Sequence, residues 1–384
     1  MHLISSTVDF KLAKRAVPGY PILLWEDMHS CEPGNAFLRY YLSRGAIGSH
    51  KSWATIAQAI YDFFGFLEAH ELSWTDTDRG EEKSLVAAYR DYCTDAAALH
   101  RNTVRLRLRY VCKFYEFAKR RGWVSNLPFS YEDRRVPLQV GNFLAHTNGD
   151  NIVATPTEMP RGHRTLKKFL SKEQVISLLS AATNPHHLTP IRLALHTGLR
   201  REELATFPLS YVFNPDHMKS RTRNIRVRLD PGDGSGMMTK GGVSRDIIMT
   251  RRFMKALYLY TVHWRGERAS QSSSAQSKLF LNQHGQAWSN DGKGLEAMVR
   301  KIGARVGIKT HPHMLRHTYA THTLVALQRH RRDNGIEPLV FLQKQLGHAS
   351  ILTTMDYLHI VDELADDAVL TYDDELNDWM EKIA

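Results

Sequence analysis

The sequence has 384 residues, an apolar fraction of 42% and a formal net charge of +11. This length suits two or three globular domains. No apolar run approaches the roughly 18 residues that a membrane-spanning helix needs, and the first ten residues lack the apolar centre of a signal peptide. The three cysteines, Cys31, Cys93 and Cys112, form no CxxC pair and indicate neither a zinc site nor a disulfide framework. We therefore expect a cytoplasmic protein without a membrane partner.

The positive charge is unevenly distributed along the chain. Residues 361–384 contain nine acidic residues and one lysine. The first 360 residues therefore carry 50 basic and 31 acidic side chains, a net charge of +19. A charge of this size makes a polyanion the first partner to consider. Solubility alone is the alternative explanation.

The N-terminal third is expected to be a helical domain preceded by an arm. Prolines and glycines interrupt residues 1–32, which predicts an irregular N-terminal arm. Apolar residues at helical spacing then predict a helical domain over residues 33–126. Its helices are expected to begin near Asn35, to cover residues 53–70 with Ser52 as the N-cap, to cover residues 82–98, and to run from residue 102 to 121 before Gly122.

The last of these helices is strongly basic. Ten basic and three acidic residues lie between Arg101 and Arg135. A solvated face is the ordinary explanation, but charges of one sign repel one another unless an anion offsets them. We therefore favour a helix that faces phosphates. The candidate contacts are Arg101, Arg105, Arg109, Lys113, Arg120 and Arg121.

Residues 127–165 are predicted to be a linker between domains. They contain four prolines and an Asn148-Gly149 pair, and they are longer than an ordinary loop within a domain. Arg164, Lys167 and Lys168 make the end of this segment basic, which suits a strap along a phosphate backbone.

The second domain is expected over residues 166–360, with helices around one small antiparallel sheet. Ser171 is the predicted N-cap of its first helix, with Glu173 in the first turn. Alternating residues predict a strand over residues 221–229 and a second over 245–250. The predicted helices cover residues 172–182, 188–196, 199–205, 251–264, 292–306, 313–329 and 338–346.

One short motif in this domain suits anion binding. His313 and Arg316 lie three residues apart, so on a helix they project from one face. Pro312 suits the first helical turn, which places His313 near a helix N-terminus, where unpaired amides favour an anion. An ordinary capping pair is the alternative, and the motif alone is not specific.

Four further sequence elements make this motif specific. Arg200 precedes it with Glu203 three residues on, and Lys240 is followed by Arg245. Leu346-Gly347-His348 follows, nine residues before Tyr357. This ordered set resembles the tyrosine recombinase family, which includes the phage integrases and the Xer-type recombinases. The resemblance covers roughly residues 165–360 and, more loosely, residues 35–125, which would be a helical core-binding domain.

The resemblance implies a two-domain DNA clamp that is mainly α-helical with a small antiparallel β-sheet. It implies that His317 and Glu203 support the active site. The implied catalytic residues are Arg200, Lys240, His313, Arg316, His348 and Tyr357.

The chemistry of these side chains agrees with that role. A phenol has a pKa near 10, so Tyr357 needs a base, for which His313 is the candidate. Arg200 and Arg316 can each bind two phosphate oxygens, His348 can donate a further hydrogen bond, and Lys240 can protonate the departing oxygen. The alternative for Tyr357 is an ordinary core tyrosine, and the alternative for Lys240 is an exposed hairpin lysine without a catalytic role. The other histidines show no paired-ligand spacing, so we expect no metal site and no cofactor.

In the family the product is a 3′-phosphotyrosyl link that needs neither metal nor ATP. Residues 328–335 look like an insertion, and with the long predicted linker they favour an integrase or transposase of a mobile element. The acidic residues 361–384 are expected to dock on a neighbouring subunit.

Two other functions stay open at this point, a type IB topoisomerase and a non-catalytic sequence-specific DNA-binding protein. For a recombinase, the expected partners are double-stranded DNA with inverted-repeat core sites, three further copies in a tetrameric synapse that assembles from monomers, and an accessory DNA-bending or directionality factor. The expected location is the bacterial cytoplasm, at the nucleoid.

Overall fold

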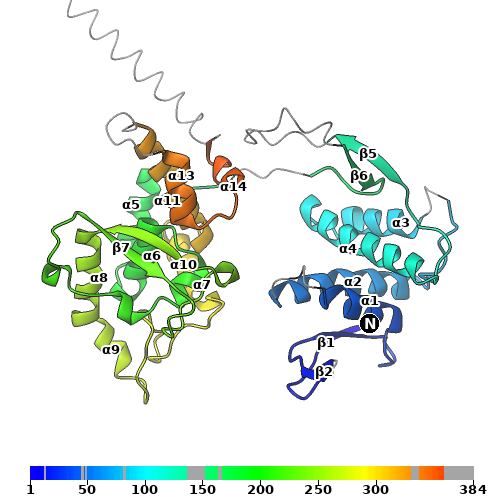
Figure 1. Ribbon diagram of the computed structural model, residues 1–384, viewed down its shortest axis with the longest axis horizontal. Coiled ribbons are helices and arrows are strands. Elements are labelled where there is room, and N and C mark those ends of the chain that lie inside the picture. The colour runs from blue at the N-terminus through cyan, green and yellow to red at the C-terminus, as the bar shows by residue number, and fades with distance from the viewer. Residues whose placement is uncertain are drawn as a thin grey trace, which may run out of the picture. The chain divides into compact units, whose positions relative to one another are not determined.

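The computed structural model describes residues 1–12, 14–44, 47, 50–80, 84–135, 152–162, 167–329 and 337–358. The chain forms two compact units, Met1–Thr165 and Leu166–Ala384, both drawn in Figure 1. Helices predominate, and each described strand has one antiparallel partner, which confirms the expected fold class. Within the described ranges no helix is both long enough and apolar enough to cross a membrane.

All four helices predicted for the first unit are present. They are α1 (Glu32–Leu42), α2 (Lys51–Ala69), α3 (Leu85–Asp91), which continues into a π-helical turn η1 (Tyr92–Ala96), and α4 (Arg101–Arg120). The apolar face of α4 is buried as predicted, and Gly122, with φ of +71°, follows its end. Three helix starts were predicted wrongly. Helix α1 begins at Glu32, three residues before Asn35. Helix α2 begins before Ser52, and α3 begins after Ser84, whose hydroxyl accepts a hydrogen bond from the amide of Ala87.

Residues 1–32 are not the irregular arm that the sequence predicted. Strand β1 (His2–Ser5) pairs with β4 (Pro21–Leu24), and the short strands β2 (Lys11–Leu12) and β3 (Arg15–Ala16) pair between them. Tyr20 and Leu23 are buried in the core of the first unit. The prolines and glycines mark turns and strand ends, so the segment is part of the domain.

Part of the predicted linker also belongs to the first unit. Strand β5 (Tyr131–Arg135) pairs with β6 (Ile152–Pro156), and Phe129 and Met159 on either side are buried in the core. Charged residues occupy most of β5 because this pair is largely exposed, and for that reason no alternating pattern revealed the strand. Residues 136–151 and 163–165 of the predicted linker lie outside the described residues.

The second unit contains the predicted helices around one two-stranded sheet. Strand β7 (Asn224–Leu229) starts three residues later than predicted, and it pairs with β8 (Arg245–Thr250). Ser171 caps α5 in a capping box with Gln174, which confirms the predicted N-cap. The predicted helices are α5 (Lys172–Ala181), α6 (Pro185–Thr197), α7 (Arg201–Ala205), α8 (Arg251–His263), α10 (Lys293–Arg305), α11 (Pro312–Arg329) and α13 (Pro338–Leu346). Two short helices, α9 (Arg265–Ala269) and α14 (Ile351–Met355), were not predicted.

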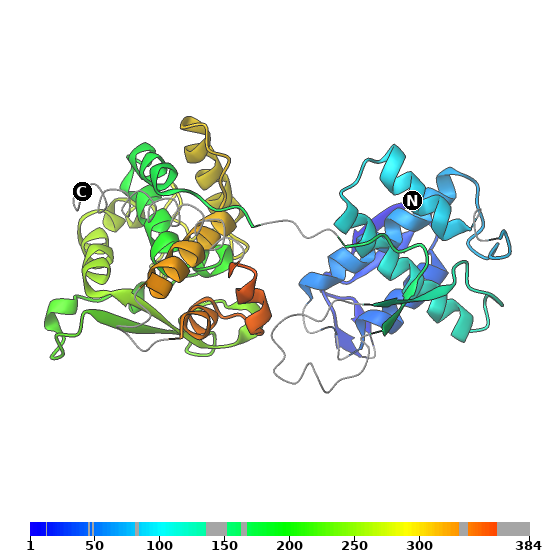
Figure 2. The same cartoon turned by 90° about the horizontal axis from the view of Figure 1, so that it is seen from above.

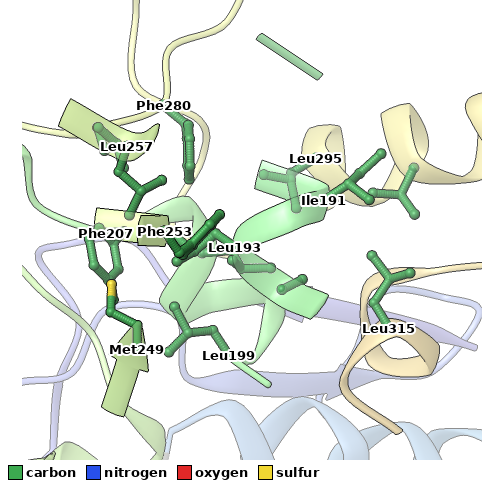
Figure 3. Close-up of a cluster of buried hydrophobic side chains, with 14 of the residues drawn as sticks. Ile191, Leu193, Leu199, Phe207, Met249, Phe253, Leu257, Phe280, Leu295 and Leu315 are labelled. Carbon is green, nitrogen blue, oxygen red and sulfur yellow. The ribbon is translucent and has the colours of Figure 1, made fainter. Parts of the chain in front are cut away.

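The core of this unit joins the sheet to the helices. Figure 3 shows side chains of α6, α8, α10, α11 and β8 meeting in one cluster, among them Leu193, Phe253 and Leu315. Strand β7 contributes Ile225, Val227 and Leu229 from its inner face, and these three are buried as the alternation predicted. The core therefore fixes the end of α6 and the start of α11, where the predicted functional residues lie.

A smaller cluster completes the second unit. Helix α11 packs against α6 and α13, and α13 also packs against β8, an arrangement that can be followed in Figure 2. Ala320, Leu324, Leu342, Leu346 and Tyr357 form this separate apolar cluster. Tyr357 is thereby packed into the body of the unit.

Candidate active site

The first arginine of the predicted set lies where α6 ends and α7 begins. Gly198 terminates α6 with φ of +66°, Leu199 is buried, and Arg200 becomes the N-cap residue of α7. The backbone amide of Arg200 donates to Oε2 of Glu203 at 2.7 Å, and Nη1 of the Arg200 guanidinium donates to Oε1 of Glu203 at 3.1 Å. Glu203 therefore contacts both the backbone and the guanidinium group of Arg200.

The second arginine is held by two backbone carbonyls. Arg316, on α11, is 1% exposed, and it donates from Nη1 to Gly198 at 2.6 Å and from Nη2 to Leu346 at 2.7 Å. Arg200 donates from Nη2 to the next carbonyl, that of Gly347, at 2.9 Å. The turn after α13 therefore aligns both guanidinium groups. Burial, together with the charge of Arg200, lowers the pKa of Arg316 to about 9.

A third arginine, which sequence reasoning did not assign to the site, pairs with Glu203, the anion that offsets this concentration of positive charge. Arg245 begins β8 and donates from Nη1 and Nη2 to the two oxygens of Glu203 at 2.6 and 2.8 Å. Burial alone would raise the pKa of Glu203, but the hydrogen bonds and charge of Arg245 hold this pKa below its ordinary value. The pattern Lys240-Gly-x-x-x-Arg245 was the available signal for this residue.

Three histidines lie beside the arginines. The rings of His313 and His317 are 4.4 Å apart, and Nδ1 of His348 lies 2.9 Å from Oγ1 of Thr354. Loss of hydration, reinforced by neighbouring positive charges, lowers the pKa to about 4 for His313 and to about 3 for His317 and His348. All three imidazoles are therefore neutral near pH 7 and able to accept a proton.

Tyr357 is covered in this structure. It is 1% exposed, its hydroxyl lies 2.8 Å from Nδ1 of His317, and its ring is parallel to that of His348 at 6.4 Å. Burial raises the pKa of Tyr357 to about 12, so the phenol is protonated near neutral pH. The sequence analysis proposed His313 as the base, but in the structure the imidazole that contacts the Tyr357 hydroxyl is that of His317.

The sixth predicted residue is not brought into this cluster. Lys240 is exposed in a short 3-10 turn, η4 (Lys240–Gly242), between β7 and β8. Its ammonium group makes no hydrogen bond or ion pair with the described residues of the site. Five of the six predicted catalytic residues are therefore assembled, whereas Lys240 lies on an exposed turn and makes no contact with them that the described residues show.

The predicted phosphate contacts differ in their exposure to solvent. Arg101, Arg109, Arg120, Arg121 and Lys168 are exposed. Arg105 donates to the carbonyl of Pro160, Lys113 lies 3.5 Å from Glu116, and Lys167 lies over the ring of Tyr357. Arg164 lies outside the described residues.

This arrangement suits chemistry at a phosphodiester. Two fixed guanidinium groups can stabilise the extra negative charge of five-coordinate phosphorus, a phenol can attack, and neutral imidazoles can take its proton. A search of the described residues found no group of three or more His, Cys, Asp or Glu side chains placed to hold a metal ion.

The fold and these residues define a two-unit protein with a phosphate-directed arginine, histidine and tyrosine site. The model of the phage integrase family matches residues 168–363, more than half of the sequence, and includes every residue of this site except Lys167. The chain belongs to the phage integrase family.

Two relatives and one solved structure illustrate the similarity. The tyrosine recombinase XerA of Saccharolobus solfataricus is 30% identical over 224 residues, 58% of this chain and 62% of the relative. The tyrosine recombinase XerD of Bifidobacterium longum is 28% identical over 232 residues, 57% of this chain and 67% of the relative. The matches thus span about two thirds of these relatives. The Tn1549 transposon integrase, solved with transposon right end DNA, shares the fold with a TM-score of 0.54 and 18% identity over 85% of this chain and 93% of that one.

Proposed function

We propose that this protein is a site-specific DNA recombinase that cuts and rejoins strands through Tyr357. The observation that carries the proposal is the turn after α13, whose successive carbonyls hold Arg316 and Arg200. That turn brings both cations to the segment that contains Tyr357. Family membership and the two Xer relatives, which are named as tyrosine recombinases, support the same activity.

In the proposed reaction, Oη of Tyr357 attacks the scissile phosphorus. The new phosphorus–oxygen bond forms as the bond to the 5′-oxygen breaks, which leaves a 3′-phosphotyrosyl link and a free 5′-hydroxyl. His313 takes the phenolic proton, for which its imidazole has a free nitrogen because it is neutral near pH 7 in the DNA-free protein. Lys240 returns a proton to the departing oxygen from its exposed turn.

Arg200, Arg316 and His348 stabilise the transition state in this proposal. Each guanidinium uses only part of its five N–H donors on the protein, so donors are left for phosphate oxygens. The phosphotyrosyl link conserves the energy of the broken bond. Rejoining to another strand therefore requires neither ATP nor a metal ion.

The partner is double-stranded DNA with inverted-repeat core sites. The net charge of +19 over residues 1–360 and the exposed arginines of α4 support a polyanionic partner. We infer a mobile-element integrase or transposase that works as a homotetramer in the synapse, with an accessory DNA-bending or directionality factor, at the nucleoid in the cytoplasm. Residues 361–384, which lie outside the described residues, would dock on a neighbouring subunit.

A covalent-complex assay tests the function. End-labelled DNA flanking the gene in its source genome is incubated with the protein in EDTA and resolved on a denaturing gel, beside Tyr357→Phe. We expect a shifted band that Tyr357→Phe does not form. A band that survives in Tyr357→Phe would assign the nucleophile to another residue. Native-gel binding without a covalent band, on every flanking segment, would contradict recombination.

A further inference from the structure

The ammonium group of Lys167 makes three contacts with residues 353–357. The ammonium group of Lys167 lies 4.4 Å from the centroid of the Tyr357 ring and 3.1 Å from Oδ2 of Asp356. It also donates to the carbonyl of Thr353 at 3.1 Å. Lys167 is the second residue of the second unit, since the division between the units falls after Thr165. The start of the catalytic unit is thus tied directly to its nucleophile segment.

We propose that Lys167 is a positioning residue that keeps Tyr357 in its covered position until DNA phosphate draws the ammonium group away. This inference rests on the proposed function, because it assigns a control step to the same tyrosine. It assigns Lys167 two alternative anionic partners, Asp356 in the free protein and a phosphate in the complex.

The covered position is a resting one. The Tyr357 hydroxyl is engaged by His317, and the side chain is 1% exposed, so a phosphorus atom cannot reach Oη without movement of residues 353–358. Each contact of Lys167 opposes that movement. A cation over an aromatic face and an ion pair with the adjacent aspartate both favour the covered state.

Phosphate is able to compete for this lysine. The Lys167 side chain is 20% exposed and that of Asp356 is 39% exposed, so their ion pair is partly solvated and weak. A DNA backbone presents a dense array of phosphates that attract such an ammonium group. The sequence-based expectation that Lys167 contacts the DNA backbone is therefore compatible with the contacts seen in the free protein.

Amide hydrogen exchange in the DNA-free protein tests the restraint directly. Lys167→Met keeps the length of the side chain and removes its charge, and Lys167→Arg keeps the charge. Lys168→Met is the matched control, because it removes one charge from an exposed neighbour that makes none of these contacts. We expect exchange over residues 351–358 to be about 5- to 30-fold faster in Lys167→Met only, as loss of contacts of this strength implies. Equal exchange in all variants would overturn the proposal.

The rate of the first covalent-complex formation after mixing with saturating DNA tests the consequence, because the wild type must first release Lys167 from Asp356 and Tyr357, whereas Lys167→Met need not. We expect Lys167→Met to form the complex faster than the wild type and Lys167→Arg to restore the wild-type rate. A slower or unchanged rate would show that Lys167 does not restrain the nucleophile. Failure of the wild type to form any complex would count against the proposed recombinase instead, whereas the exchange comparison needs no DNA and tests Lys167 alone.

Discussion

The carboxylate of Glu203 accepts hydrogen bonds from both outer nitrogens of Arg245, at 2.6 and 2.8 Å. The same carboxylate receives the backbone amide of Arg200. Because the side chain of Glu203 is 1% exposed, α7 and β8 share one buried anion. The orientation of Arg200 therefore depends on a strand that begins 45 residues later in the chain.

Removing the charge of Glu203 is predicted to be costly. Glu203→Gln leaves Arg245 and Arg200 without their anion, and breaking a buried pair costs about 3–5 kcal/mol. We expect the free energy of unfolding to fall by about this amount in urea titrations. The control is Asp246→Asn, which breaks the exposed pairs with Arg226 and Arg228 and is expected to cost less than about 1 kcal/mol. Similar costs for the two variants would contradict this account.

Two glycines with similar backbone angles are predicted to differ in their tolerance of alanine. At Gly198, with φ of +66°, a Cβ would lie 2.5 Å from the Tyr319 ring and 2.6 Å from Leu346. At Gly307, with φ of +69°, a Cβ would meet nothing within 4 Å. We expect Gly307→Ala to cost about 1 kcal/mol from backbone strain and Gly198→Ala about 2–4 kcal/mol from strain plus overlap.

The rate of DNA cleavage should also differ between the same two variants. The carbonyl of Gly198 holds Arg316, so Gly198→Ala is expected to slow covalent-complex formation, while Gly307→Ala leaves it unchanged. Thermal unfolding and the covalent-complex assay measure the two effects. Equal behaviour of the two variants would show that the close approach at Gly198 is not needed.

The buried histidines predict a loss of stability in mild acid. The pKa values of His317 and His348 are lowered to about 3 from 6.5, so the unfolded chain binds protons below pH 6.5 that the folded chain does not. The stability that depends on their neutral forms is complete above pH 6.5 and falls as the pH drops towards 3. Each contributes on the order of 1 kcal/mol per pH unit.

Urea unfolding at about pH 7 and about pH 5 measures this dependence. His317→Gln is expected to reduce the difference between the two pH values. His284→Gln, at an exposed position, is the control and should leave the difference as in the wild type. A pH dependence that His317→Gln does not alter would assign it to other groups.

The proposed role of Lys240 is predicted to depend on the leaving group. Lys240→Ala is expected to slow cleavage by about 10²- to 10⁴-fold, the usual contribution of a general acid. A substrate with sulfur in place of the bridging 5′-oxygen needs no proton on departure and should restore most of the rate. Arg200→Ala should be slow on both substrates, because it stabilises charge on the phosphorus. No rescue of Lys240→Ala by sulfur would exclude a general-acid role.

Much of the fold could be predicted from local patterns. The helices α4, α5, α8, α10 and α13 follow apolar periodicity and capping residues, and β7 follows strict alternation. Residues 1–32 and the β5–β6 pair were missed because their strands are short and largely exposed. In those strands most side chains face solvent, so the sequence lacks the alternation of apolar and polar residues that marks a strand with one buried face.

The site was predictable as a set of motifs but not as a set of contacts. Residue types and order pointed to Arg200, Arg316, His313, His348 and Tyr357. The contacts of Arg245 with Glu203, of His317 with Tyr357 and of Lys167 with Asp356 join residues 40 to 189 positions apart. Such pairs arise from tertiary packing, which brings α7 to β8 and brings α11 and the chain before α5 to the segment after α14, and local spacing does not specify it.

The turn of Leu346 and Gly347 makes the alignment of both arginines depend on the packing of α13. Its two carbonyls hold the two cations, and it can do so only while α13 is packed against α11 and β8. If α13 separates, both arginines lose their alignment in the same event. In the proposed recombinase, a chain in which α13 has not docked therefore lacks both fixed cations at once.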